Sequence, residues 1–332
     1  MLSLTWAILS ALTLSVNAGN KIWDGSFNPF TTATDFDKWD WSTPVGTYQW
    51  YIHGSQSTSR YLAVSSDYKN PAMSSEQRGL KLTIDGTSNW NGQTLERTEL
   101  IPQTSSNLGS GNLFYHFSVK RSSTNPPDST LEHQVCFFES HFTELKYGVG
   151  SNPTSLTWMI SGAEQWNIPF DANTWFNFAY DIDVSKYSRS GNAVVNDRPI
   201  VKFSAGTVGL WASTGSDPLK KVVQNRSAPT STNSADWHLG VLRIVTNQTP
   251  EDWYFSGVYV ENGPITTAIG SGGSPPSSSP PASTSPSTTQ PTTTQAPTTT
   301  TAGPTQTQWG QCGGVGWTGP TVCMYTSFTC ID

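Results

Sequence analysis

The sequence predicts an all-β domain at residues 19–267, built from two antiparallel sheets packed as a sandwich or jelly roll. Short segments rich in β-branched and aromatic residues alternate apolar and polar side chains, and Gly, Pro, Asn and Ser separate them. No window shows the i, i+3, i+4, i+7 apolar spacing of a helix. Many short strands in a domain of this length are typical of two packed sheets, and a closed barrel is the alternative. The segments expected to form strands are 78–85, 93–100, 112–121, 133–142, 155–161, 175–184, 201–213, 238–246 and 253–261.

Residues 1–18 are predicted to be a signal peptide. They form an apolar run without a charged side chain, and Val16 and Ala18 suit a cleavage site after Ala18. The run is too short for a comfortable membrane span, and no later stretch reaches the ~18–20 apolar residues that a spanning helix needs. A retained signal anchor is the alternative. We expect a secreted, extracellular protein whose mature chain begins near Gly19.

The composition favours a carbohydrate partner. The chain of 332 residues has a net charge of −6 and no basic run, which argues against nucleic acid and anionic membranes as partners. It holds 14 Trp, 11 Tyr and 14 Phe with only 13% charged residues, and flat apolar rings suit stacking on sugar faces. Asn225 and Asn247 begin N-glycosylation sequons, as a secretory route allows. We expect a monomer that binds polysaccharide.

Two further segments follow the predicted domain. Residues 268–308 are dense in Ser, Thr and Pro and contain no aromatic residue, so they cannot form a core. This composition predicts an extended, O-glycosylated linker, and an unglycosylated disordered segment is the alternative. Residues 309–332 form a small Gly-rich unit that contains Cys312, Cys323 and Cys330.

Two strand segments could each supply a carboxylate with a basic neighbour. In "QTLERTEL", Arg97 and Glu99 share one face of a strand, and in "HQVCFFESHF", His133, Glu139 and His141 share one face. Acids within apolar runs need an explanation, because unpaired buried carboxylates are costly. One explanation is acid/base catalysis, since glycosidic bond cleavage uses a carboxylic acid and a carboxylate. The other is solvent-facing acids paired with cations.

Three other residues are candidates for the site or for the core. His238 precedes a segment that looks buried, so it is a candidate either for the site or for the core. Trp50 is a candidate sugar-stacking platform, although most Trp residues in a β-sandwich belong to the core. Cys136 is expected to face the core between the sheets as a small hydrophobic residue. No cofactor or metal is expected, because the His and acidic residues show no compact ligand spacing, although a structural Ca²⁺ bound by loop oxygens at 65–71 stays open.

Several motifs together resemble glycoside hydrolase family 131. They are "RTEL", "HQVCFFESHFTELKYG", "WFNFAYDID" and "ADWHLGVLRI", and the resemblance covers 19–264. The resemblance implies a secreted fungal-type β-glucanase with a jelly roll and a concave cleft, acting on β-1,3, β-1,6 or β-1,4 glucans, with inversion. It places the two catalytic acids at Glu99 and Glu139. Arg97, His133 and His238 would be supporting cleft residues.

Two rival functions remain. "RTEL" on a sheet also resembles alginate and glucuronan lyases, but their Gln-x-His and Tyr-x-Lys-x-Gly companions read "HQV" and "ELKYGVG" here. A non-catalytic β-glucan lectin would need an aromatic cleft but not two opposed acids. Products with an unsaturated sugar would identify a lyase.

The tail "WGQCGGVGWTGPTVCMYTSFTC" closely resembles the start of a fungal family 1 carbohydrate-binding module. That family carries four paired Cys residues and three platform aromatics. The resemblance implies a Cys312–Cys330 disulfide, leaves Cys323 without a partner, and retains only Trp309 of the cellulose-binding platform. We therefore expect a truncated module with weak or absent cellulose binding and a reactive Cys323.

Overall fold

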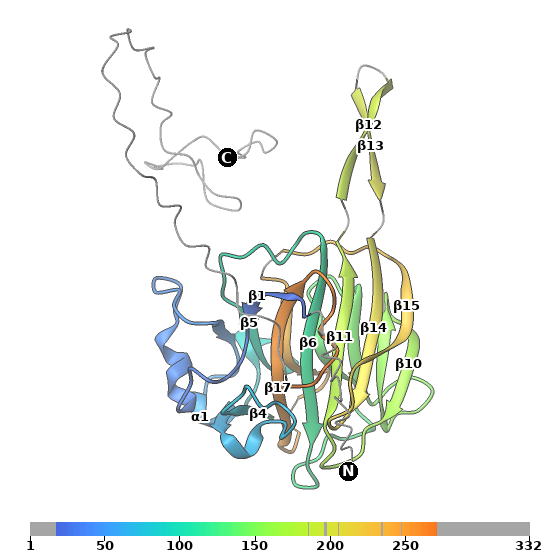
Figure 1. The fold of residues 1–332 in the computed structure, drawn as a ribbon. Coiled ribbons are helices and arrows are strands. Elements are labelled where there is room, and N and C mark those ends of the chain that lie inside the picture. Colours follow the sequence, from blue (N-terminus) through green and yellow to red (C-terminus); the bar gives the residue numbers. More distant parts are fainter. Residues whose placement is uncertain are drawn as a thin grey trace, which may run out of the picture. The chain divides into compact units, whose positions relative to one another are not determined.

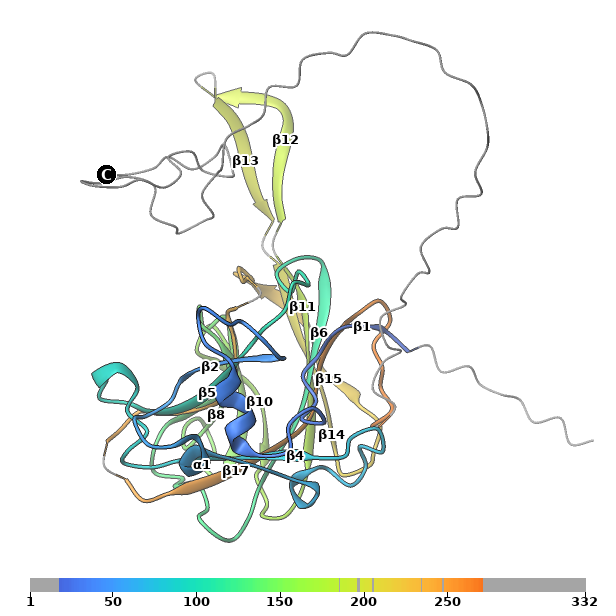
Figure 2. The same ribbon diagram turned by 90° about the vertical axis from the view of Figure 1, so that its left-hand side faces the viewer.

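The structure, a computed structural model, describes residues 18–184, 186–195, 198–204, 206–233, 235–246 and 248–270. These residues form two antiparallel sheets that pack face to face, and the view in Figure 2 separates the sheets (Figures 1 and 2). The predicted two-sheet sandwich is confirmed. Residues 1–17 of the predicted signal peptide, nearly all of the predicted linker and residues 309–332 lie outside the described residues.

The first sheet has eight strands in the order β15-β14-β11-β6-β17-β4-β3, and β1 also pairs with β17. Its strands are β1 (Asn20–Asp24), β3 (Leu62–Ser65), β4 (Gly79–Ile84), β6 (Asn112–Arg121), β11 (Phe176–Asp183), β14 (Gly206–Thr214), β15 (Lys220–Ala228) and β17 (Glu251–Asn262). The long β17 binds β4 through its first half and β1 through its second half, and it pairs with β6 along most of its length.

The second sheet has seven strands in the order β10-β9-β8-β7-β16-β5-β2. Its strands are β2 (Tyr48–Ile52), β5 (Glu96–Pro102), β7 (His133–Phe138), β8 (Thr143–Tyr147), β9 (Ser155–Ile160), β10 (Ala163–Pro169) and β16 (Trp237–Arg243). The strands β12 (Lys186–Val195) and β13 (Arg198–Ser204) form a separate hairpin that projects beyond both sheets (Figure 1). The helical pieces are short: η1 (Ala33–Lys38), α1 (Thr58–Tyr61), η2 (Ser66–Tyr68) and η3 (Trp90–Gly92).

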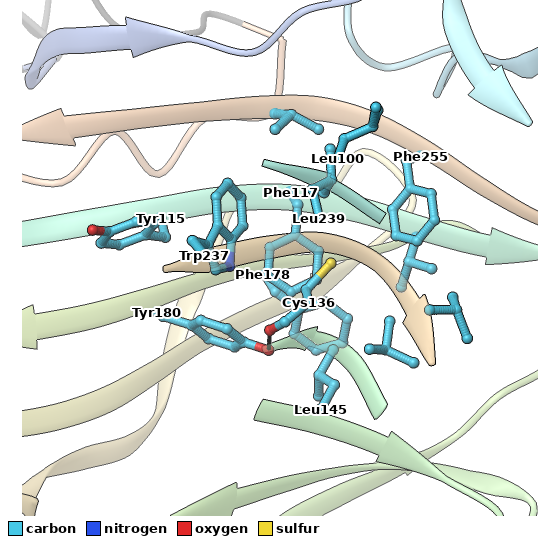
Figure 3. Packing of buried hydrophobic residues seen from close by; sticks show 14 of the residues in the cluster. Leu100, Tyr115, Phe117, Cys136, Leu145, Phe178, Tyr180, Trp237, Leu239 and Phe255 are labelled. Atoms are coloured by element: carbon cyan, nitrogen blue, oxygen red, sulfur yellow. Dashed lines mark hydrogen bonds between the residues drawn. The ribbon is translucent and has the colours of Figure 1, made fainter. Parts of the chain in front are cut away.

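The core fills the space between the sheets and is rich in aromatic residues (Figure 3). Trp237 of the seven-stranded sheet packs edge-on against Tyr115 of the other sheet, with ring centroids 5.2 Å apart. Cys136 lies in this cluster and is fully buried, as predicted. Alternating strand residues supply these side chains, so the opposite face of each sheet stays available for polar groups.

A β-bulge interrupts the pairing of β7 with β16. The register shifts between His238 and Val241, so two residues of β16 oppose Cys136 of β7, whose φ is +47°. Cys136 and Val135 consequently both belong to the core cluster although they are consecutive. The Tyr180 hydroxyl of the opposite sheet donates to the Cys136 carbonyl at 3.0 Å (Figure 3). The bulge therefore reverses the alternation of β7 in its second half.

This reversal corrects the prediction for His133. The sequence pattern placed His133 on the same face as Glu139, but His133 is fully buried and its Nε2 lies 2.7 Å from Glu251 of β17. Glu251 also pairs with Arg243, whose guanidinium binds Glu96. His133 thus belongs to a buried ionic network between the sheets, and not to the predicted cleft.

No helix within the described ranges is long and apolar enough to cross a membrane.

Candidate active site

Four of the predicted site residues meet on the side of the seven-stranded sheet that faces away from the core. Arg97 and Glu99 come from β5, and His238 comes from the neighbouring β16. Glu139 follows the end of β7 in a tight turn, where its backbone N–H donates to Asp236 at 2.9 Å. Because β5, β16 and β7 are adjacent strands, the sheet itself sets the spacing of these groups.

Glu99 is a buried carboxylate held by two cationic partners. Its side chain has no exposed surface, and Arg97 donates to its two oxygens from Nε and Nη2, each at 2.7 Å. His238 Nδ1 lies 2.5 Å from Glu99 Oε2. Two N–H bonds from one guanidinium fix both the position and the plane of a carboxylate. Glu99 is therefore a preorganised group that changes little in orientation.

Glu139 is the exposed counterpart of Glu99. Its side chain is 68% exposed, and its Oε2 lies 3.1 Å from His238 Nε2. The hydrogen bond from His238 lowers the pKa of Glu139, and the charges of His238, Arg97 and His141 lower it further. Glu139 is consequently ionised across the neutral and mildly acidic range.

His238 stands between the two carboxylates, with one ring nitrogen directed at each. Burial alone lowers the pKa of this ring, but the hydrogen bonds and charges of Glu139 and Glu99 outweigh burial, and the pKa is raised. The protonated ring donates from both nitrogens. Phe137 stacks on the imidazole at a centroid distance of 4.6 Å, which fixes the plane of the ring.

A second polar group continues along the same sheet face. His141 Nδ1 lies 3.0 Å from Glu144, and the ring of His141 stacks against Phe137 at 5.2 Å. Lys146 of β8 binds Glu132 at 2.7 Å and lies 3.5 Å from Glu144. This side of the site is thus lined by charged groups.

Trp50 is not the exposed platform that was predicted. It is only 5% exposed, belongs to the core cluster, and donates from its indole N–H to Thr58 at 3.0 Å. Its neighbour Tyr51 points to the other face, because successive strand residues alternate. Burial raises the pKa of Tyr51, and the nearby carboxylates Glu99 and Glu139 raise it further.

Three aromatic residues near the site were not singled out by the sequence. Tyr51 contacts Trp41 at a centroid distance of 5.0 Å and Trp90 at 5.9 Å, and the guanidinium of Arg97 lies 5.5 Å from the Trp90 ring. Trp41 lies outside any strand and Trp90 lies in η3, so no periodic pattern marks them. The only sign of such residues in the sequence was the high content of Trp and Tyr, which does not say which of them lie near the site.

Of the remaining predicted positions, only Asn225 lies within the residues that the structure describes. Asn225 is exposed on β15, at the edge of the eight-stranded sheet, so it is accessible to modification. Asn247, Trp309, Cys312, Cys323 and Cys330 lie outside the described residues. Within the described part of the chain, no group of three His, Cys, Asp or Glu side chains is arranged to hold a metal ion.

The chain matches two protein families. Residues 22–266 match the family described as the glycoside hydrolase 131 catalytic N-terminal domain, and residues 308–331 match the fungal cellulose binding domain. The catalytic domain of the glycoside hydrolase family 131 protein from Coprinopsis cinerea is 62% identical, with a TM-score of 0.69, over 76% of this chain and 99% of that one. A family 131 β-glucanase catalytic domain from Podospora anserina is 45% identical, with a TM-score of 0.68, over 76% of this chain and 100% of that one. An acetylxylan esterase from Hypocrea jecorina is 75% identical over 24 residues, which are 7% of this chain and 8% of the esterase.

Proposed function

The chain belongs to the glycoside hydrolase 131 family, and from this premise we propose that it is a secreted enzyme that hydrolyses β-glucosidic bonds of cell-wall β-glucan. The substrate class is a glucan with β-1,3, β-1,6 or β-1,4 linkages. The observation that carries the proposal is the single imidazole of His238 bound by Glu99 on one nitrogen and Glu139 on the other. Two carboxylates in unlike environments are what glycoside hydrolysis requires.

Glu139 takes the role of general base. Its exposed carboxylate can reach a water molecule, and its lowered pKa keeps it in the ionised form that accepts a proton. The base is thus the carboxylate that is open to solvent.

The proton for the leaving oxygen comes from the Glu99 and His238 pair. This pair is buried, and the raised pKa of His238 keeps a proton there. Each turnover moves a proton from this pair to the leaving oxygen and puts the proton of the attacking water on Glu139. The contact between Glu139 and His238 Nε2 gives that proton a path back.

The ring between the carboxylates also bears on stereochemistry. Inverting glycosidases separate their two carboxyl groups by ~6.5–9.5 Å, whereas retaining enzymes hold them ~5–5.5 Å apart. An intervening imidazole that binds both carboxylates favours the longer separation. We therefore propose inversion at the anomeric carbon.

The test is product release by E99Q and E139Q variants on β-1,3, β-1,6 and β-1,4 glucans, with a uronate polymer assayed beside them. Each variant is expected to lose at least ~10²-fold in kcat, because general acid/base groups contribute ~10²–10⁴-fold. E132Q is the control, since Glu132 is a partly exposed acid that pairs with Lys146. Near-normal hydrolysis by both variants would refute the assignment, and an unsaturated uronate product would identify a lyase.

The C-terminal match supports a cellulose connection for the same enzyme. Retention of the full chain on microcrystalline cellulose, but not of a chain that ends at residue 267, would show that the C-terminal segment binds cellulose, and equal retention of the two chains would show that it does not.

A further inference from the structure

Trp41 is the most exposed large hydrophobic side chain in the described part of the chain. Its side chain is 73% exposed, whereas the other exposed large hydrophobic residues are aliphatic. A single exposed apolar residue is ordinary on a protein surface. The neighbours of Trp41 and its place relative to the active site make this residue informative.

Trp41 ends a row of aromatic rings that begins beside the catalytic carboxylates. The guanidinium of Arg97, which binds Glu99, lies over Trp90; Trp90 contacts Tyr51, and Tyr51 contacts Trp41. Successive centroids in the row are 5.9 and 5.0 Å apart. The pairing of Ile52 with Glu99 places the end of β2 directly beside the catalytic position of β5. The row is therefore continuous with the active site.

The turn that carries Trp41 is held in place. The Asp40 carboxylate accepts hydrogen bonds from the backbone N–H groups of Ser42 and Thr43 at 2.7 and 2.8 Å. The Asp40 and Thr43 backbones also bond to each other in both directions. The ring of Trp39 contacts the Trp41 ring edge-on at a centroid distance of 5.1 Å, and Trp39 is itself only 7% exposed. A ring held in this way loses little freedom when it binds a ligand.

The two sides of the active site differ in chemistry. On the β2 side, the row presents apolar rings, whereas on the β8 side the face carries His141, Glu144 and Lys146. The C–H faces of a pyranose ring pack on flat aromatic surfaces, and its hydroxyls remain free for water. A row of aromatic rings can therefore stack against consecutive sugar units of a chain, whereas a small charged ligand would gain little from such apolar surfaces.

From this geometry we infer that Trp41, Tyr51 and Trp90 are stacking subsites for a glucan chain that extends from Glu139 across β2. This inference rests on the proposed function and deepens it. The enzyme gains transition-state binding from several sugar units on one side of the scissile bond. Its preferred substrates are consequently chains that reach Trp41, and short fragments are poor substrates.

The test measures kcat/KM for β-glucan oligosaccharides from the disaccharide to the hexasaccharide. For the wild-type enzyme, kcat/KM is expected to rise with chain length. The W41A variant is expected to lose ~10–100-fold on the longest chain, equivalent to ~1.4–2.8 kcal/mol, and progressively less on shorter chains. W41F should recover part of the loss, because an aromatic face is restored. An unchanged dependence on chain length in W41A would overturn the inference.

W211A is the matched control. Trp211 is a partly exposed Trp on β14 of the other sheet, where its ring lies 5.5 Å from the Lys221 ammonium. Its removal should leave the dependence on chain length as in the wild type. An equal loss in W211A would show that the W41A effect is a general consequence of removing a surface Trp.

Binding without turnover separates this inference from the proposed function. Calorimetry with the E139Q variant measures hexasaccharide affinity, and adding W41A to that variant should weaken it by ~10-fold or more. If the wild type hydrolyses no β-glucan but W41A still weakens binding, the hydrolase proposal fails and the stacking row stands. If the wild type hydrolyses β-glucan and W41A changes neither binding nor length dependence, the stacking row fails and the hydrolase proposal stands.

Discussion

The Nε2 atom of His238 lies 3.1 Å from Oε2 of Glu139, and this contact couples the charge of the exposed carboxylate to a buried ring. The hydrogen bond from His238 is the largest cause of the lowered pKa of Glu139. In return, Glu139 helps to raise the pKa of His238 against the effect of burial. Glu139 therefore stays ionised to a lower pH, and His238 stays protonated to a higher pH, than either group would alone.

The first prediction concerns the pH dependence of hydrolysis. In the wild type, activity should persist below the ordinary Glu pKa of ~4.3, because Glu139 stays ionised, and should fall only above the ordinary His pKa of ~6.5, where His238 loses its proton. In H238Q, the acidic limb of the kcat/KM profile should move up toward ~4.3, and the alkaline limb should disappear. The profile of kcat/KM against pH measures both limbs.

The control for this prediction is H53Q. His53 bonds to the Gly54 carbonyl and stacks on Trp50, and within the described part of the chain no hydrogen bond or ion pair joins it to Glu99 or Glu139. Its replacement should leave both limbs in place. An acidic limb in H238Q that matches the wild type would show that His238 does not set the ionisation of Glu139.

The second prediction concerns the support of the bulge by Tyr180. The Tyr180 hydroxyl donates to the Cys136 carbonyl, which the bulge removes from the strand ladder. Y180F leaves that buried carbonyl unpaired, and the free energy of unfolding should fall by about 1–3 kcal/mol. Because the bulge also orients Phe137 and Glu139, kcat should fall as well. Denaturant unfolding and steady-state kinetics measure the two effects.

Y115F separates stability from orientation. Tyr115 also donates from a buried hydroxyl to a backbone carbonyl, that of Leu108, at 2.5 Å. Y115F should lower stability to a similar degree but leave kcat near the wild-type value at temperatures where the protein is folded. Equal kcat in the two variants would mean that the bulge does not position the site.

The sequence predicted part of the site because β5 is a regular strand. Alternation put Arg97 and Glu99 on one face, and the structure joins them by two hydrogen bonds. The same reasoning was wrong for β7, because the bulge at Cys136 reverses the faces beyond it. Gly240 of β16, which pairs with Glu99, was the feature of the sequence that could have indicated the bulge, since a Gly within a strand often marks one.

The aromatic row could not be predicted for a different reason. Alternation in β2 separates Trp50 from Tyr51, but the sequence does not say which of the two faces meets the core. That choice depends on how β2 pairs with β5, which is a long-range contact. Trp41 lies in a turn without periodicity, so only its exposure in the folded chain distinguishes it from core Trp residues.

The third prediction concerns the buried ionic network behind the active site. Glu251 binds His133 at 2.7 Å and Arg243 at 2.6 Å, and all three side chains are at most 1% exposed. Burial alone raises the pKa of Glu251, but the hydrogen bond and charge of His133, with Arg243, outweigh it, so the pKa is lowered. A carboxylate with a lowered folded-state pKa stabilises the fold above its unfolded pKa of ~4.3, and that stabilisation disappears as the pH falls through the folded-state value.

E251Q should therefore lower the free energy of unfolding at neutral pH by about 3–5 kcal/mol, because it removes the counter-charge that Glu251 supplies to the buried Arg243 guanidinium. The difference from the wild type should shrink as the pH falls below the unfolded-state pKa of ~4.3, because the unfolded wild-type carboxylate then binds a proton that the folded one, with its lowered pKa, does not. Urea unfolding at a series of pH values measures this difference. E132Q, which removes a partly exposed pair with Lys146, should cost at most about 1 kcal/mol. A difference between wild type and E251Q that does not change with pH would mean that packing, and not the charge of Glu251, causes the loss.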